Sequence, residues 1–360
     1  MWEFFVSARY LVAKQKERFI SLTSFISILG IAVGVAALIV VIGVMSGFDE
    51  ELQNKIMGMN AHLIVVSDQS SPLRAEEIER LRRASTPGFE EVVAAADFVS
   101  GQGMISKGKE VCGVLLKGVD PVGEANVTKI NEYLKMGSLP FSNEEVIIGS
   151  ELAKRFDLNI GESLSILSLG SKKPMGLKVC GIFTSGMYEY DLNLVLTNIK
   201  TAQQILGMGE SISGIALKLR DPLKARQVKI DIQKQLGFSY WVRTWIDMNR
   251  NLFSAIKLEK LVMFIILALI VLVACLNIAS TLIMMVIEKT KDIGILKSIG
   301  TSNASVMKIF ILEGLLIGII GSCIGGIAGL WLARLINKYP LIEIFGLREI
   351  YYFDKLPVNV

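Results

Sequence analysis

Apolar residues gather in three long segments, and polar residues fill the stretches between them. The segments cover residues 19–45, 261–287 and 309–333. Each exceeds the roughly 20 residues that an α-helix needs to cross the hydrocarbon core of a bilayer. The first two contain no charged residue, and the third contains only Glu313. The pattern therefore predicts three transmembrane helices.

Basic residues indicate on which side of the membrane each polar stretch lies. Arg9, Lys14, Lys16 and Arg18 precede the first segment, and further lysines lie in 288–308. Since cytoplasmic flanks are enriched in Lys and Arg, we expect both stretches in the cytoplasm. The first segment is too long for a signal peptide and no A-x-A site follows it, which indicates an uncleaved signal anchor. The predicted order is a cytoplasmic amphipathic N-terminal helix (1–18), transmembrane 1 (19–45), a periplasmic domain (46–257), transmembrane 2 (258–287), a cytoplasmic stretch (288–308), transmembrane 3 (309–333) and a periplasmic tail (334–360).

The stretch between the second and third segments has the pattern of a short amphipathic helix. Lys291, Asp292 and Lys297 are assigned to one side of it. The other side is predicted to hold apolar residues, namely Ile293, Ile295, Leu296 and Ile299. A small amphipathic helix between two spans can dock onto a soluble partner and pass the partner's motion into the bilayer.

Residues 46–257 are enough for one or two compact lobes, and their pattern is mixed. Runs of Val, Ile and Leu predict strands at 61–67, 91–99, 110–119, 145–149, 163–169, 177–183, 192–196 and 215–219. Helices are predicted at 72–84, 150–156, 198–206 and 222–236. Strands interrupted by separate helices favour an α+β domain. The predicted fold class is thus an α-helical transmembrane protein with a large α+β periplasmic domain inserted between the first and second spans.

Residues that catalysis or metal binding would need are sparse. His62 is the only histidine, and the apolar run after it indicates a structural residue at a strand edge, because one imidazole cannot build a metal site alone. Residues 103–110 approach the spacing of a phosphate-binding loop, but Glu110 replaces the Ser or Thr that would hold magnesium, which favours a polar hairpin. Cys112 and Cys180 lie in predicted strands and are either free thiols or a disulfide in an oxidising compartment.

Composition agrees with a membrane protein that has a sizeable polar part. The 360-residue chain is 52% hydrophobic, and its mean hydropathy is +0.51, a value that soluble globular chains rarely reach. The net charge of +4 is small and spread out. No basic stripe is present, so a nucleic-acid partner is not expected.

Small and polar residues interrupt the apolar spans. Gly30 and Gly34 form one G-x-x-x-G motif, and a second series comprises Gly314, Gly318, Gly321, Gly325 and Gly329. Small residues let helix backbones approach closely in lipid, either within one subunit or at a subunit interface. Hydrogen bonds across helices are expected from Asn277, Ser280 and Thr281. For Glu313 we favour a structural role near the inner headgroups.

Six motifs in a fixed order give the chain a family resemblance. They are MSGFDEEL (45–52), NAHL (60–63), LKGVDP (116–121), MYEYD (187–191), NIASTL (277–282) and DIGILK (292–297). Over essentially its whole length the chain resembles a permease subunit of the lipoprotein-releasing ABC transporter, the LolC/LolE type, within the wider class of FtsX-like and MacB-like permeases. DIGILK alone is shared widely, whereas the ordered set is specific. The family also has a fourth span and a longer hook loop than 169–176, and this sequence departs from both.

The resemblance implies a transporter of the bacterial cell inner membrane. Two permease subunits, identical or different, would pair with two cytoplasmic ABC ATPase subunits, take lipoproteins from the membrane and pass them to a periplasmic chaperone. ATP would be used by the partner subunit, so this chain would bind no cofactor and would be no enzyme. The implied ATPase coupling residues are Glu288, Lys291, Asp292, Ile293, Gly294, Ile295, Leu296 and Lys297. The implied acyl-chain contacts are Val41, Val44, Met45, Phe48 and Met263. The implied chaperone hook is Lys172, Lys173, Pro174 and Met175.

Three alternatives to this interpretation differ in what they require of the chain. A MacB-like export permease usually carries its ATPase on the same chain. A non-transporting FtsX-like signal relay usually needs a smaller outer domain. A membrane-anchored adhesin or scaffold would not need the DIGILK stretch.

Overall fold

The computed structural model describes residues 18–67, 88–108, 110–168, 173–237, 240–339 and 357–359, with side chains from residue 25 onward except that of Ser67. The chain forms two compact units. The helical unit comprises Met1–Glu50 and Ser254–Val360, and the sheet unit comprises Glu51–Phe253. Most of the predicted N-terminal helix (1–18), the predicted helix 72–84 and most of the tail lie outside the described residues.

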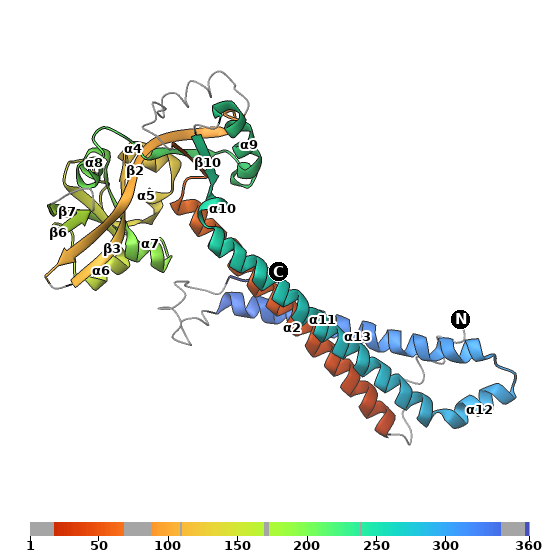
Figure 1. Cartoon of the computed structure of the whole chain (residues 1–360). Coiled ribbons are helices and arrows are strands. Elements are labelled where there is room, and N and C mark those ends of the chain that lie inside the picture. The colour runs from red at the N-terminus through yellow and green to blue at the C-terminus, as the bar shows by residue number, and fades with distance from the viewer. Residues whose placement is uncertain are drawn as a thin grey trace. The chain divides into compact units, whose positions relative to one another are not determined.

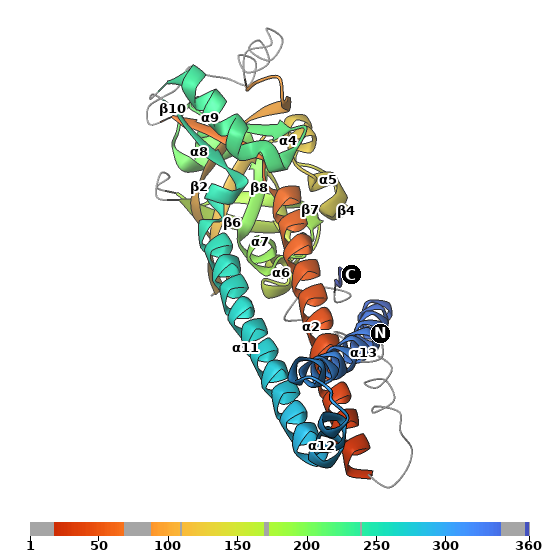
Figure 2. The same ribbon diagram turned by 90° about the vertical axis from the view of Figure 1, so that its right-hand side faces the viewer.

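Three long helices and one short helix make up the described helical unit. They are α2 (Arg18–Met59), α11 (Arg250–Glu288), α12 (Thr290–Ser298) and α13 (Asn303–Lys338). The long ones, α2, α11 and α13, are long and apolar enough to cross a membrane, and each contains one predicted segment. All three helices are longer than their apolar segments and include polar residues at both ends. The short helix α12 lies where α11 passes into α13 (Figures 1 and 2).

Glycines of α13 pack closely against α2. A Cβ atom built on Gly325 would lie 2.4 Å from the carbonyl oxygen of Ala32, so only glycine fits there. Nearer its start, α13 meets α11, where a Cβ on Gly314 would lie 3.1 Å from the Leu282 side chain. Further close approaches join Gly321 to Ile31 and Gly329 to Ala36. Packing within one subunit is therefore the role of these four glycines.

One mixed sheet organises the sheet unit. Its strands are β1 (Leu63–Ser67), β2 (Val92–Lys107), β3 (Glu110–Val119), β4 (Leu134–Gly137), β5 (Glu145–Gly149), β6 (Ser163–Ser168), β7 (Met175–Phe183), β8 (Leu194–Asn198), β9 (Gly214–Leu219) and β10 (Tyr240–Thr244). Their order is β10-β1-β9-β2-β3-β8-β5-β7-β4, and β6 pairs with β2 and β7. The pairs β3–β8 and β5–β7 are parallel, whereas the other pairs are antiparallel.

Helices connect and cover the strands. They are α4 (Pro121–Val127), α5 (Ile130–Tyr133), α6 (Ser150–Arg155), α7 (Tyr188–Asn193), α8 (Ile199–Leu206), the 3-10 helix η1 (Pro222–Lys224), α9 (Ala225–Leu236) and α10 (Trp245–Met248). Strands and separate helices make the unit α+β, as predicted.

Most predicted elements of the sheet unit are present. The eight predicted strands correspond to β1, β2, β3, β5, β6, β7, β8 and β9, and three predicted helices correspond to α6, α8 and η1 with α9. The polar hairpin at 103–110 is confirmed, because Lys107 of β2 pairs with Glu110 of β3. The strand predicted at 192–196 begins only at Leu194, since α7 continues to Asn193.

The end of α2 is part of the sheet unit's core. Ile56 is completely buried in a hydrophobic cluster with residues of β1, β9 and α9. The Asn60 side chain donates a hydrogen bond of 2.7 Å to the Tyr190 hydroxyl, and the Lys129 amide donates one of 2.8 Å to the Gly58 carbonyl. Apolar burial and hydrogen bonds thus fix the last turns of this helix.

A buried ion pair joins β3 to α4 in the sheet unit. Lys117 of β3 places its ammonium 2.6 Å from a carboxylate oxygen of Glu124 in α4, and the two side chains are 17% and 4% exposed. Glu124 also accepts a hydrogen bond of 3.3 Å from the Thr128 hydroxyl. Each charge therefore has its partner, without which burial would be costly.

Candidate functional site

α2 and α11 run antiparallel, and polar side chains join them within the spans. The hydroxyl groups of Ser27 and Thr281 are hydrogen-bonded. A Cβ atom on Gly30 would lie 2.9 Å from the amide nitrogen of Asn277, so glycine lets the two helices approach here. Thr281 thus bonds across helices as predicted, whereas Ser280 is exposed. Such polar contacts stabilise helix pairs where lipid gives no hydrophobic driving force.

An ion pair joins the same two helices near the end of the first apolar segment. The Asp49 Oδ2 atom lies 3.0 Å from the Lys260 ammonium. Asp49 is only 6% exposed, and its Oδ1 atom has no hydrogen-bond partner in the described part of the chain. Sequence reasoning missed this pair, because charges that flank a span usually face the headgroups.

Three of the predicted acyl-chain contacts, namely Met45, Phe48 and Met263, lie within about one helical turn of this ion pair. Met45 precedes Asp49 by four residues and Met263 follows Lys260 by three, so each shares a helix face with its charged neighbour. The register of the two helices places Met45 level with Met263. The exposure differs within the group: Val41 is 39% exposed, and the half-buried members are Val44, Met45, Phe48 and Met263. Contact with an acyl chain stays a prediction.

The predicted coupling helix forms at the opposite end of the helical unit. It is α12, whose Ile293 packs against a cluster that contains Met285 of α11 and Phe310 of α13. At its start, the Lys289 ammonium lies 3.5 Å from a carboxylate oxygen of Asp292. α12 is therefore anchored to both helices that it connects. Beyond it, Glu313 of α13 is 2% exposed, a buried position that agrees with a structural role.

The predicted division of α12 into a charged and an apolar side is wrong. Ile295 and Ile299 are 58% and 77% exposed, whereas Ile293 and Leu296 are half-buried. The reason is geometric, because Ile295 lies two residues, or about 200°, around the helix from Ile293. The exposed side of α12 combines the apolar side chain of Ile295 with the charged side chains of Lys291 and Lys297, and Gly294 is exposed as well. Glu288 is half-buried at the end of α11, and Asp292 is half-buried in α12.

A groove of about 400 Å³ lies beside the buried side of α12. Residues of α11, α12 and α13 line it, namely Leu282, Val286, Ile293, Lys297, Asn303, Val306, Met307, Phe310 and Ile311. Two predicted coupling residues, Ile293 and Lys297, are therefore part of an apolar depression with one cationic group.

The predicted chaperone hook is only partly described. Lys172 lies outside the described residues, and Lys173 and Pro174 are exposed. Met175 is the first residue of β7 and pairs with Ile166 of β6. Two residues of the predicted hook, Lys173 and Pro174, are thus exposed next to the β6–β7 hairpin. Contact with a chaperone stays a prediction.

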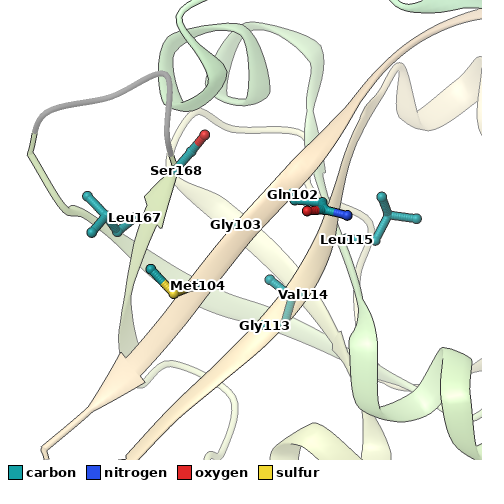
Figure 3. Close-up of a pocket in the computed structure, with 8 residues that line it drawn as sticks. All are labelled: Gln102, Gly103, Met104, Gly113, Val114, Leu115, Leu167 and Ser168. Atoms are coloured by element: carbon teal, nitrogen blue, oxygen red, sulfur yellow. The ribbon is translucent and has the colours of Figure 1, made fainter.

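A second groove crosses the sheet next to this hairpin. It has a volume of about 470 Å³ and is lined by Gln102, Gly103, Met104, Gly113, Val114, Leu115, Leu167 and Ser168. Figure 3 shows Met104 and Leu167 on the same side of the glycines. A Cβ atom on Gly113 would meet nothing within 4 Å, so the strand surface is open there.

The titratable residues that the sequence singled out in the sheet unit are structural. The His62 Nδ1 atom accepts a hydrogen bond of 3.0 Å from the Leu219 amide, and burial lowers the pKa of His62. Cys112 and Cys180 are free thiols, so the disulfide alternative is wrong. Burial raises the pKa of Cys180 to about 11, which keeps this thiol protonated and unreactive.

The buried carboxylate of Asp191, in the sheet unit, also escaped sequence reasoning. Asp191 is fully buried and accepts hydrogen bonds of 2.7 Å from both the amide and the hydroxyl of Ser185. Burial raises the pKa of Asp191 despite these bonds. Its place in the MYEYD motif was the available signal, and its bonds show that it fixes the turn before α7.

Family comparisons cover nearly the whole chain. Residues 24–235 match the MacB-like periplasmic core domain, and residues 264–358 match the FtsX-like permease C-terminal domain. The chain is 32% identical to the lipoprotein-releasing system transmembrane protein LolC of Neisseria meningitidis serogroup B, across 99% of this chain and 90% of that protein. The chain belongs to the LolC/LolE family.

Other members of the LolC/LolE family give the same picture. LolC of Xylella fastidiosa is 34% identical across 99% of this chain and 89% of that protein. LolE of Haemophilus influenzae is 30% identical across 98% and 89%. Among solved structures, the periplasmic region of MacB from Actinobacillus actinomycetemcomitans is similar at 15% identity, covering 55% of this chain and 94% of that chain, with a TM-score of 0.36. The LolC and LolE relatives and the two matched family models confirm the predicted resemblance.

Proposed function

We propose that this chain is the permease subunit of an ATP-driven complex that releases lipoproteins from the bacterial inner membrane. Its near full-length similarity to proteins named as lipoprotein-releasing transmembrane subunits carries this proposal. In the proposed topology the N-terminus is cytoplasmic, the sheet unit is periplasmic, and α12 faces the cytoplasm. The complex hands its cargo to a periplasmic chaperone, for which the hook hairpin is the candidate contact.

In this proposal a cytoplasmic ATPase binds to the exposed side of α12. The exposed side chains of Ile295 and Ile299 offer apolar area to a partner, while Ile293 connects α12 to α11 and α13. The ATPase subunit uses the ATP, and this chain is no enzyme. A second permease subunit completes the complex.

At the other end of α2, the proposed acyl-chain contacts are Val41, Val44, Met45, Phe48 and Met263. An exposed acyl chain in water costs about 0.8 kcal/mol per CH₂, so an apolar surface is needed to receive cargo from the membrane. The half-buried methionines suit this role, because their flexible side chains adapt to irregular apolar ligands.

Two experiments test the proposal. Depletion of the chain should leave outer-membrane lipoproteins in the inner-membrane fraction, and normal sorting would contradict the transport role. Normal sorting would favour the alternatives, a MacB-like export permease or an FtsX-like signal relay.

The second experiment measures co-purification of the ATPase with variants of α12. Ile295→Asp should reduce this co-purification, as should charge reversal of both Asp292 and Lys297. The control is Ile160→Asp, an exposed isoleucine of the sheet unit, which should leave co-purification unchanged.

A further inference from the structure

Only one of the two carboxylate oxygens of Asp49 has a partner among the described residues. Its Oδ2 atom pairs with Lys260 at 3.0 Å, while Oδ1 is buried without a partner in the described residues. The side chain is 9% exposed. A buried acceptor without a donor is unfavourable, and in a native structure it calls for a partner such as a ligand, an ion or a water molecule.

We propose that Asp49 Oδ1 accepts a hydrogen bond from an N–H group at the lipid-bearing end of the cargo. This assignment rests on the proposed function and adds a residue that recognises the head of the lipidated polypeptide rather than its acyl chains. Lys260 holds the Asp49 carboxylate in place and acts as a positioning residue.

The spacing along α2 supports this division of roles. Val41, Met45 and Asp49 follow one another at intervals of four residues and share one face of the helix. Asp49 therefore lies one turn, about 6 Å by helical rise, beyond Met45. In a lipidated polypeptide the amide N–H groups come directly after the acyl chains. An acyl chain along Val41 and Met45 would bring such an N–H to the level of Asp49.

Charge determines which donor fits. Lys260 neutralises Asp49, so the pair has no net charge to attract a further cation, and a neutral amide N–H is favoured. The neighbouring carboxylate is already engaged, because the Asn359 side chain donates to Glu50. An aminophospholipid offers the same chemistry, an N–H donor joined to acyl chains, and must be distinguished from the cargo by experiment.

The test removes the donor from the ligand and the acceptor from the protein. The whole permease–ATPase complex is reconstituted in phosphatidylcholine vesicles. Its affinity is measured for an acylated lipopeptide and for the same lipopeptide with N-methylated amides at its lipid-bearing end. Wild type should bind the N-methylated ligand about tenfold more weakly, the effect of one buried acceptor left unpaired. Asp49→Ala should bind both ligands equally.

Two further variants separate this role from folding and acyl contact. Met45→Ala should weaken both lipopeptides by the same factor and keep the tenfold discrimination. Lys257→Met, an exposed lysine one turn from Lys260, should change nothing. Lys260→Met should reduce the discrimination without abolishing binding, because the carboxylate loses its support.

Three outcomes would overturn the assignment. Equal binding of both lipopeptides by wild type, or discrimination that survives Asp49→Ala, would show that Asp49 does not read the amide. If phosphatidylethanolamine competes with the lipopeptide in wild type and not in Asp49→Ala, the donor is the lipid ammonium instead. Failure of the proposed function looks different, because wild type would then bind neither lipopeptide.

Discussion

Replacing Gly325 by alanine tests the packing of α13 on α2. The added Cβ atom would lie 2.4 Å from the Ala32 carbonyl oxygen and 2.9 Å from the Val35 side chain. Ordinary contact begins at 3.4 Å, so the helices must separate locally by the difference of 3.4 and 2.4, or about 1 Å. The next residue gives a matched control, since a Cβ atom on Gly326 would meet nothing within 4 Å.

The expected magnitude follows from comparing the two variants. Both replace glycine by alanine inside one helix, so the gain in helix propensity, up to about 1 kcal/mol, cancels in the comparison. What remains is the overpacking cost at Gly325, about 1–3 kcal/mol. A gap of 0.5–1 Å also removes about a quarter to a half of the dispersion attraction of nearby contacts, which include those of Gly321 and Gly329.

The measurement is the free energy of unfolding of the full chain in mixed micelles, by denaturant titration. We expect Gly325→Ala to be less stable than Gly326→Ala by about 1–3 kcal/mol, and Gly326→Ala to equal or exceed wild type. Equal stability of the two variants within about 0.5 kcal/mol, the limit of additivity for independent sites, would refute the α2–α13 contact.

Two further predictions concern the sheet unit. Burial lowers the pKa of His62 from its ordinary 6.5, so below about pH 6.5 the unfolded chain binds a proton that the folded chain does not. The free energy of unfolding should therefore fall as the pH drops, and an unchanged pH slope in His62→Asn would contradict this. Lys117→Met leaves the Glu124 carboxylate buried and unpaired, at a cost of about 3–5 kcal/mol in denaturant unfolding. Lys129→Met is the control, because it breaks a pair with Glu132 in which both side chains are exposed, at 56% and 68%. It should cost at most about 1 kcal/mol, and equal losses would argue against a special role of the buried pair.

Long-range regularity explains which elements could be predicted from the sequence. The three spans are uninterrupted apolar runs, and strands such as Glu145–Gly149 are compact runs of β-branched residues next to turn signals. β4 is short and largely exposed, so no alternation is visible in it. β10 does alternate, with Val242 and Thr244 buried and Trp241 and Arg243 exposed, and this signal was missed. The helices α5 and α4, of four and seven residues, are too short to show a 3.6-residue period and were not predicted.

The candidate site was harder to predict because its contacts are tertiary. Asp49 and Lys260 are far apart in sequence, and each alone resembles an ordinary charge at the end of a span. The hydroxyl pair of Ser27 and Thr281 depends in the same way on which helix faces meet. On α12, the sequence showed that apolar residues were present, but Ile295 was placed on the wrong side because a short helix leaves several groupings possible.

The shared register of α2 and α11 restricts how these helices can move. The hydroxyl contact between Ser27 and Thr281 and the ion pair between Asp49 and Lys260 lie at opposite ends of the seam. Sliding one helix along the other by a single turn, about 5.4 Å, would break both contacts and leave the hydroxyl groups and the Asp49 carboxylate without these partners. A tilt of the two helices together, as one unit, keeps both contacts. We therefore expect a movement transmitted from the proposed ATPase to tilt this helix pair rather than to slide one helix along the other.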